Sequence, residues 1–248
     1  MKDAHGREIK YLRVSVTDRC NLRCKYCMPN GIECVGHKDI LSFEEIRQIA
    51  ACGAKLGITK IRLTGGEPLA RKGCPQLIRM LKEIPGMEKI AMTTNGTLVR
   101  AILPQLVEAG LDEINISLDT LDAETFAQIT GQDLLPEVLK SIDASLEAGL
   151  KVKVNAVSMP DTDWRRMVSL AKEKPVDVRF IELMPIGAGK QSKGRSNKEL
   201  LEEISNEYPE LQADNSVHGA GPAVYYKIPG FQGSIGLISA MHGKFCAS

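Results

Sequence analysis

Tyr11-Leu-Arg-Val-Ser-Val-Thr17 runs directly into Asp-Arg-Cys20-Asn-Leu-Arg-Cys24-Lys-Tyr-Cys27, so a predicted β-strand ends in a loop that carries three cysteines. Cysteine thiolates are the soft ligands that iron–sulfur clusters use, and a complete set is four. Three thiolates on so short a loop can hold three irons of a cubane cluster. The fourth iron would then keep an open position for a small molecule, which indicates chemistry rather than simple electron transfer.

Two other interpretations of this loop stay open on spacing alone. The three cysteines could form part of a zinc site that a distant His or Cys completes. They could also be three buried thiols without a ligand.

Strands alternate with helices after this loop, which predicts a parallel sheet. Six strand–helix units are fewer than the eight of a closed barrel, so we expect an α/β fold of the incomplete (β/α)6 barrel type. Predicted capping boxes start helices at Ser42 and Ser196, each with Glu three residues later. Residues 1–186 are predicted to form the partial barrel. Residues 187–248 are predicted to form a connector, a helix and a β-hairpin. Over the whole chain, the predicted strands are 11–17, 58–64, 89–94, 113–117, 151–157, 176–183, 224–227 and 234–239.

Composition narrows the class of protein. The chain has 248 residues, of which 43% are hydrophobic, enough for one sizeable core. A net charge of +1 argues against general binding to nucleic acid or a membrane surface. The first residues have no apolar segment typical of a signal peptide, and no apolar run approaches membrane-spanning length. Seven cysteines, an odd number, fit the reducing cytoplasm.

Several predicted strands carry cations within apolar runs. Side chains alternate between the faces of a strand, so Lys60 and Arg62 share a face, as do Lys153 and Asn155. The ordinary interpretation is a solvated face. In a barrel, however, unpaired cations facing the interior would be costly unless an anion binds there, and a triphosphate suits Arg and Lys. The set comprises Arg13, Lys60, Arg62, Lys153 and Arg179.

The cysteine loop resembles the signature of the radical S-adenosylmethionine (SAM) family, with Tyr26 as the aromatic residue before the third cysteine. Gly65-Gly66-Glu67-Pro68 is similar to the second signature of that family, which meets the methionine end of SAM. More specific motifs make essentially the whole chain resemble the GTP 3′,8-cyclase family of molybdenum-cofactor biosynthesis. They are Arg13-Val-Ser-Val-Thr-Asp-Arg-Cys20, Arg62-Leu-Thr-Gly-Gly-Glu-Pro68, Thr93-Thr-Asn-Gly96, Asn115-Ile-Ser-Leu-Asp119, Lys153-Val-Asn155 and Arg179-Phe-Ile-Glu-Leu-Met184.

This resemblance implies roles for individual residues. Cys20, Cys24 and Cys27 would hold a [4Fe–4S] cluster that reductively cleaves SAM, and the resulting radical would convert GTP to 3′,8-cyclo-7,8-dihydroguanosine 5′-triphosphate. The resemblance implies SAM contacts from Tyr26, Gly66, Ser117 and Met184. It implies GTP contacts from Arg13, Arg62, Thr93 and Lys153, with Lys60 and Arg179 as neighbours.

Partners follow from the same resemblance. It implies a reductase or flavodoxin-type electron donor and cyclic pyranopterin monophosphate synthase as the next enzyme, and it is compatible with a homodimer. No nucleic acid or membrane is expected.

The end of the sequence departs from the family pattern. By resemblance, Cys246 is the first ligand of a second cluster, but the two further cysteines, the arginines between them and the Gly-Gly tail are missing before the end at Ser248. We therefore expect a truncated or incomplete chain. Two alternatives follow: a radical SAM enzyme with another substrate, such as a peptide, or an inactive remnant that binds SAM or nucleotide. Cys34, Cys52 and Cys74 are expected to be structural thiols, and the four histidines surface or loop residues, at His5, His37, His218 and His242.

Overall fold

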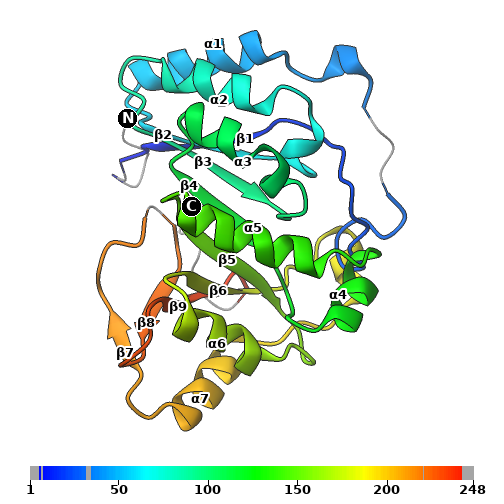
Figure 1. Ribbon diagram of the computed structural model, residues 1–248, viewed down its shortest axis with the longest axis vertical. Coiled ribbons are helices and arrows are strands. Elements are labelled where there is room, and N and C mark those ends of the chain that lie inside the picture. The colour runs from blue at the N-terminus through cyan, green and yellow to red at the C-terminus, as the bar shows by residue number, and fades with distance from the viewer. Residues whose placement is uncertain (1–5, 7, 32–34, 220, 242–248) are drawn as a thin grey trace. The chain divides into compact units, whose positions relative to one another are not determined.

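The computed structural model describes residues 6, 8–31, 35–219 and 221–241. Helices and strands alternate through most of the chain (Figure 1). The strands are β1 Tyr11–Ser15, β2 Lys60–Thr64, β3 Lys89–Thr94, β4 Glu113–Ser117, β5 Lys151–Ser158, β6 Asp177–Glu182, β7 Gln212–Asp214, β8 Val224–Lys227 and β9 Ser234–Ile238. The α-helices are α1 Phe43–Lys55, α2 Cys74–Lys82, α3 Val99–Glu108, α4 Ala123–Thr130, α5 Leu135–Glu147, α6 Trp164–Glu173 and α7 Asn197–Glu207.

Local sequence signals start several helices where they were predicted. The Ser42 hydroxyl accepts from the Glu45 N–H, and the Glu45 carboxylate accepts from the Ser42 N–H, which completes the capping box of α1. Ser196 and Glu199 repeat this arrangement at α7. These bonds satisfy N–H groups that the first turn of a helix leaves without partners. Both predicted capping boxes are confirmed.

The chain divides into two compact units. The first comprises the residues up to 21, then 31–116 and 136–151. Its strands β1, β2, β3 and β4 follow one another in a parallel arrangement, as alternating strands and helices predict. Helices α1 and α2 pack side by side, and α2 also contacts α3 and β3 (Figure 1).

The second unit comprises residues 22–30, 117–135 and 152–248. Here β6 pairs in parallel with β5 on one side and with β9 on the other. Strands β9, β8 and β7 continue as antiparallel neighbours. Helices α6 and α7 pack on β6, beside one another in Figure 1. The predicted hairpin of β8 and β9 is confirmed, whereas β7 and the parallel β6–β9 pair were not predicted.

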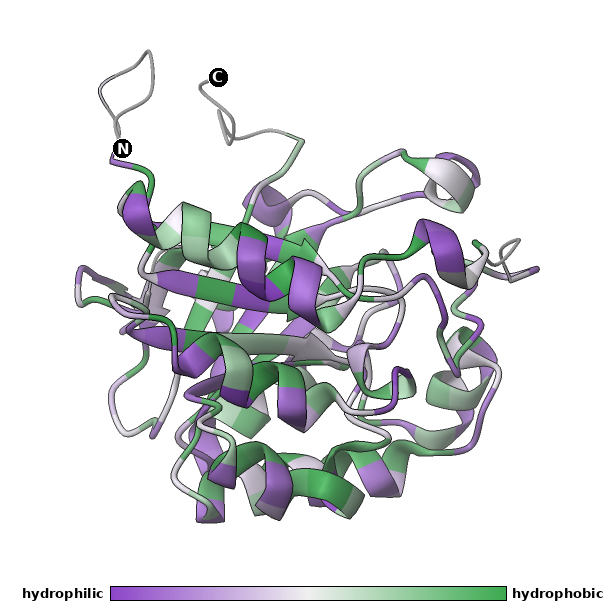
Figure 2. Ribbon diagram, turned by 90° about the horizontal axis from the view of Figure 1, so that it is seen from above, coloured by the Kyte–Doolittle hydropathy of each residue, from purple (hydrophilic) through white to green (hydrophobic). Residues whose placement is uncertain are grey.

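Alternation along β2 separates the apolar core from the polar face. Ile61 and Leu63 have no exposed surface, and their neighbours Ile90 and Met92 on β3 are equally buried. The helices also carry both hydrophobic and hydrophilic residues, as expected when one side faces a core (Figure 2). Burial of these apolar side chains supplies the main stabilisation, at about 25 cal/mol per Å².

Among the described strands, the order does not return to β1, so the sheet that they form is not closed into a barrel. The predicted open α/β fold is thus confirmed. Within the described ranges, none of the helices has the length and apolar character needed to cross a membrane.

Candidate functional site

The cysteine loop follows β1 and is exposed enough to meet a ligand. Cys27 is exposed, and Cys20 and Cys24 are half-buried. Backbone N–H groups of Cys27 and Met28 both donate to the Cys24 carbonyl at 3.0 Å, which forms a tight turn around the second and third cysteines. None of the five described cysteines forms a disulfide.

The Gly65-Gly66-Glu67 turn is joined to the chain just before Cys20. The Gly66 N–H donates to the Thr17 carbonyl and the Glu67 N–H to the Arg19 carbonyl, both at 2.8 Å. A Cβ atom at Gly66 would lie 2.3 Å from the Arg19 carbonyl oxygen, so only glycine permits this approach. Gly65 is exposed and Gly66 is half-buried, so part of this turn remains accessible.

Glu67 holds the end of β3 in place. Its buried carboxylate accepts from the Thr94 hydroxyl at 2.8 Å and from the Asn95 N–H at 2.7 Å. Burial raises the pKa of Glu67, and the hydrogen bond from the Asn95 backbone opposes that effect. The Asn95 amide in turn points its Nδ2 at the Cys20 sulfur, at 3.9 Å. A donor aimed at a thiolate is the kind of outer contact that tunes iron–sulfur clusters.

Cationic side chains gather on one face of the first unit. Lys60 donates to the Glu113 carboxylate at 2.6 Å, and an Arg62 nitrogen lies 3.6 Å from the same oxygen. Lys60 and Arg62 are 9% and 8% exposed, and Glu113 is 3% exposed. Burial alone would raise the pKa of Glu113, but the hydrogen bond and charge of Lys60 outweigh it and lower that pKa. Arg13, the register partner of Arg62 on β1, is exposed.

A small residue lets these charges meet across an intervening strand. Ala91 on β3 is the register partner of both Arg62 and Glu113. Strands lie about 4.8 Å apart, so Lys60 and Arg62 reach over β3 to contact a carboxylate two strands away. Thr93, two residues beyond Ala91, is half-buried on the same face.

Lys153 is the most deeply placed cation of the second unit, at 3% exposure. Its ammonium lies 2.9 Å from the Asp177 carboxylate and donates to the Tyr225 hydroxyl at 3.0 Å. It also donates to the His218 carbonyl at 2.5 Å. Arg179, on the same face, donates to the Asn155 side chain at 2.9 Å.

The expectation of unpaired cations was therefore wrong for Lys60, Arg62 and Lys153. Glu113 and Asp177 lie on the same strand faces and balance part of the charge. Both acids lie inside predicted strands. Because side chains two residues apart share a face of a strand, Asn115 could have indicated that Glu113 lies on the same face. Lys60 and Arg62 share Glu113 with Lys89, which approaches it at 3.7 Å, so this strand face of the first unit keeps more positive than negative charge.

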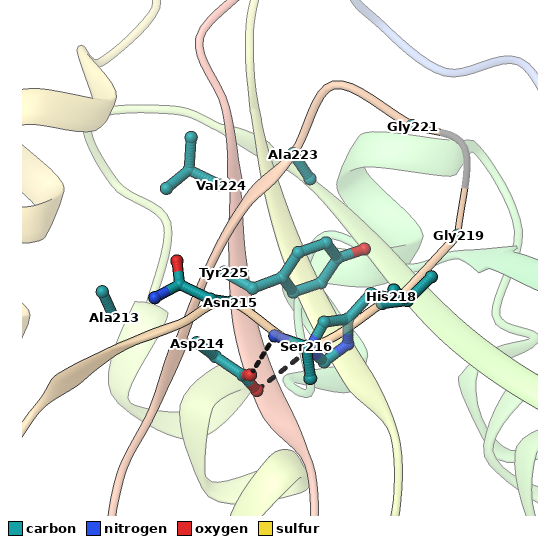
Figure 3. Close-up of a pocket in the computed structure, with 11 residues that line it drawn as sticks. Ala213, Asp214, Asn215, Ser216, His218, Gly219, Gly221, Ala223, Val224 and Tyr225 are labelled. Carbon is teal, nitrogen blue, oxygen red and sulfur yellow. Dashed lines mark hydrogen bonds and ion pairs between the residues drawn. The ribbon is translucent and has the colours of Figure 1, made fainter.

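His218 lies in a loop, as predicted, but its side chain is only 11% exposed. Its Nδ1 lies 3.1 Å from Asp177 and its Nε2 lies 2.9 Å from Asp214, which also accepts from the Ser216 N–H. The ring stacks on Tyr225 with centroids 3.9 Å apart (Figure 3). Hydrogen bonds from Ser216 lower the pKa of Asp214, and His218 adds to that effect. A cavity of about 360 Å³ lies beside these residues.

Tyr26 forms a side-chain hydrogen bond with Asp119, which follows β4. Its hydroxyl donates to the Asp119 carboxylate at 2.6 Å, and Asp119 also accepts from the Val157 N–H at 2.8 Å. The remaining predicted SAM residues lie at strand ends: Ser117 is the exposed last residue of β4, and Met184 follows β6 with 47% exposure. These positions leave both side chains accessible to a ligand.

The remaining cysteines behave differently from the loop. Cys74 is 1% exposed, and burial raises the pKa of its thiol to about 12, which fits the predicted structural role. Cys52 lies in α1, as predicted, and is exposed. Cys34, His5, His242 and Cys246, the predicted ligand of a second cluster, lie outside the described residues.

The three cysteines of the loop are soft thiolate donors of the kind that iron–sulfur clusters use. A cubane cluster takes one thiolate for each iron, which matches three separate cysteines. The glycine turn beside Cys20 and the Asn95 amide directed at its sulfur support that fit.

Comparison with known proteins agrees with this chemistry. Residues 14–173 match the Radical SAM superfamily, and residues 176–248 match Molybdenum Cofactor Synthesis C. The structure is similar to SuiB from Streptococcus suis bound to S-adenosylmethionine, with a TM-score of 0.69 and 19% identity over 80% of this chain and 47% of that one. At that identity the likeness shows the fold. The fold and the site thus define a radical SAM protein, with SAM and a [4Fe–4S] cluster as the implied cofactors.

Closer relatives specify the family. The chain is 47% identical over 250 residues to the GTP 3′,8-cyclase of Clostridium perfringens (strain 13 / Type A). The alignment covers 99% of this chain and 77% of the relative. It is 45% identical over 255 residues to that of Moorella thermoacetica, covering 100% and 78%. The chain belongs to the GTP 3′,8-cyclase family, whose reaction is the first step of molybdenum-cofactor biosynthesis.

Proposed function

We propose that this chain converts GTP to 3′,8-cyclo-7,8-dihydroguanosine 5′-triphosphate. The observation that carries the proposal is the excess of cations over carboxylates on the strand face of Lys60 and Arg62. Such a face suits a polyphosphate, since Arg and Lys bind phosphate oxygens with charge-assisted hydrogen bonds. A peptide substrate would have no comparable need of buried cations.

Cys20, Cys24 and Cys27 would hold the cluster. When bound, the reduced cluster supplies the electron that cleaves SAM and so starts hydrogen abstraction from the ribose of GTP. A second cluster, with Cys246 as one ligand, remains part of the proposal by resemblance to the family. Cys27 is exposed on its turn, which leaves room for ligands to approach.

Tyr26, Gly66, Ser117 and Met184 would contact SAM. Gly66 is half-buried, and its lack of a side chain lets the turn lie directly against the backbone before Cys20. Ser117 and Met184 are exposed at the ends of β4 and β6. Carboxyl ends of parallel strands are where barrel-type enzymes place their substrates, which supports these assignments.

Arg13, Arg62, Thr93 and Lys153 would contact GTP, with Lys60 and Arg179 beside them. Their part is to bind and orient the triphosphate, because a misplacement of about 1 Å can cost about 100-fold in rate. Lys153 already contacts three acceptors, so nucleotide would exchange with one of them. The His218 carbonyl is the acceptor on a loop and therefore the one we expect to yield.

The rest of the proposal concerns organisation. Residues 1–186 would form the radical SAM partial barrel, and residues 187–248 the connector and the start of the region that closes the barrel. A reductase or flavodoxin-type protein would donate the electron, cyclic pyranopterin monophosphate synthase would take the product, and the chain would work in the cytoplasm. A homodimer is compatible with this scheme.

The test is anaerobic turnover by the reconstituted chain with SAM, in the presence and absence of GTP. We expect 5′-deoxyadenosine and the cyclised nucleotide to appear together by mass spectrometry. Lys153→Ala should abolish the nucleotide product, whereas Lys151→Ala, at an exposed position of the same strand, should keep it. Product formation by Lys153→Ala at the wild-type rate would count against the anion site. Cleavage of SAM without any GTP product would favour the peptide alternative, and no SAM cleavage would favour a remnant.

A further inference from the structure

Asp119 joins three segments of the second unit. It follows β4 by two residues, its Oδ2 accepts from the Tyr26 hydroxyl at 2.6 Å, and its Oδ1 accepts from the Val157 N–H of β5 at 2.8 Å. Both carboxylate oxygens are thus used, one by a strand and one by the cysteine loop. Hydrogen bonds to a charged acceptor are shorter and stronger than neutral ones.

Two backbone hydrogen bonds also anchor the cysteine loop in this unit. The Arg23 N–H donates to the Thr130 carbonyl and the Lys25 N–H donates to the Ile129 carbonyl, both at 2.9 Å. These bonds fix the backbone before Tyr26 to the last turn of α4. Tyr26 itself lies between Cys24 and Cys27, so a bond at its side chain acts directly on the turn that carries both thiols.

The geometry gives this hydrogen bond a fixed direction. The Tyr26 hydroxyl donates to Asp119 Oδ2, while the Val157 N–H occupies Oδ1. The carboxylate is therefore held by the strand on one side and holds the Tyr26 side chain on the other.

We propose that Asp119 is a positioning residue, which holds the Tyr26 ring and through it fixes Cys24 and Cys27 for the cluster. The inference rests on the proposed role of these cysteines. It adds a residue outside the predicted site set and gives the Tyr26 hydroxyl a task separate from any contact that its ring makes with SAM. Mutation of a residue that hydrogen-bonds to a metal ligand commonly lowers metal affinity by about 10–100-fold.

Three variants separate loop positioning from general stability. Tyr26→Phe keeps the ring but leaves one Asp119 oxygen without its donor. Asp119→Asn keeps an acceptor for the Val157 N–H but removes the charge. In the double variant Tyr26→Phe/Asp119→Asn, a neutral amide replaces the carboxylate that lost its donor, so the apo chain should unfold in urea closer to the wild-type midpoint than Tyr26→Phe does.

The decisive readout is cluster retention in the reconstituted protein. Under a chelator, we expect Tyr26→Phe and the double variant to lose the cluster about tenfold faster than wild type. We also expect the electron paramagnetic resonance change induced by SAM to need correspondingly more SAM. Tyr208→Phe is the control, because its ring packs edge-on against Phe231, remote in sequence from the cysteine loop.

The outcomes distinguish the two levels of the argument. Wild-type cluster retention in Tyr26→Phe, or its recovery in the double variant together with stability, overturns the positioning role. A wild-type chain that binds no cluster through Cys20, Cys24 and Cys27 overturns the proposed function first. Faster cluster loss in the double variant, with a urea midpoint closer to wild type than that of Tyr26→Phe, supports Asp119 as a positioning residue.

Discussion

Glu113→Ala should lower the free energy of unfolding by about 3–5 kcal/mol, the cost of removing one partner from a buried ion pair. The estimate applies because Lys60 and Arg62 are 9% and 8% exposed and share this one carboxylate. For a chain of this size, that loss corresponds to a fall in melting temperature of about 6–20 °C. Urea unfolding followed by circular dichroism measures it. Glu108→Ala is the control, because its pair with Arg79 is exposed and should be worth at most about 1 kcal/mol.

Added tripolyphosphate extends this test to function. The two cations lose their internal counter-ion in Glu113→Ala, so an anion that binds them should stabilise the variant more than wild type. The reasoning is refuted if Glu113→Ala is as stable as wild type, because the cations would then be adequately solvated. Equal stabilisation of both proteins by tripolyphosphate would refute the link between this face and phosphate.

Three further predictions concern charge and thiol chemistry. The pKa of Glu113 is lowered in the folded chain, so the stabilisation that this carboxylate gives should be complete above its ordinary pKa of 4.5 and disappear as the pH falls. In urea titrations, the difference in stability between wild type and Glu113→Gln should therefore shrink below about pH 4.5. Asp177→Asn should lower the free energy of unfolding by about 1–3 kcal/mol in the same assay, because the hydrogen bond to Lys153 loses its charge. Iodoacetamide at pH 8 should label exposed Cys52 and leave Cys74 unmodified until the chain is unfolded, as peptide mass spectrometry would reveal; early labelling of Cys74 contradicts its burial.

Local signals made much of the fold predictable. Ser42 and Ser196 start helices through side-chain bonds to residues three positions away, and alternating strands and helices indicated the parallel sheet. Strand β7 was not predicted, because its three residues, Gln212–Asp214, do not alternate between apolar and polar. The parallel pairing of β9 with β6 depends on contacts far apart in sequence, which periodicity does not contain.

The places of the candidate site residues in the fold were predictable to the same limit. Motifs located the cysteine loop and the cations, because each lies within a few residues of a strand end. They did not show that Glu113 and Asp177 would balance those cations, because pairing depends on register between strands. His218 was missed for the same reason: the acids on its two sides come from β6 and β7.

Ala91 gives the cationic face a consequence for sequence divergence. Its methyl group lies between Arg62 and Glu113 in the register, and only a side chain this small leaves their path across β3 clear. A larger residue at position 91 would isolate the carboxylate from its cations while leaving all three charges in place. Positions 62, 91 and 113 should therefore change together or not at all, so a bulky residue at 91 should be accompanied by loss of the acid at 113.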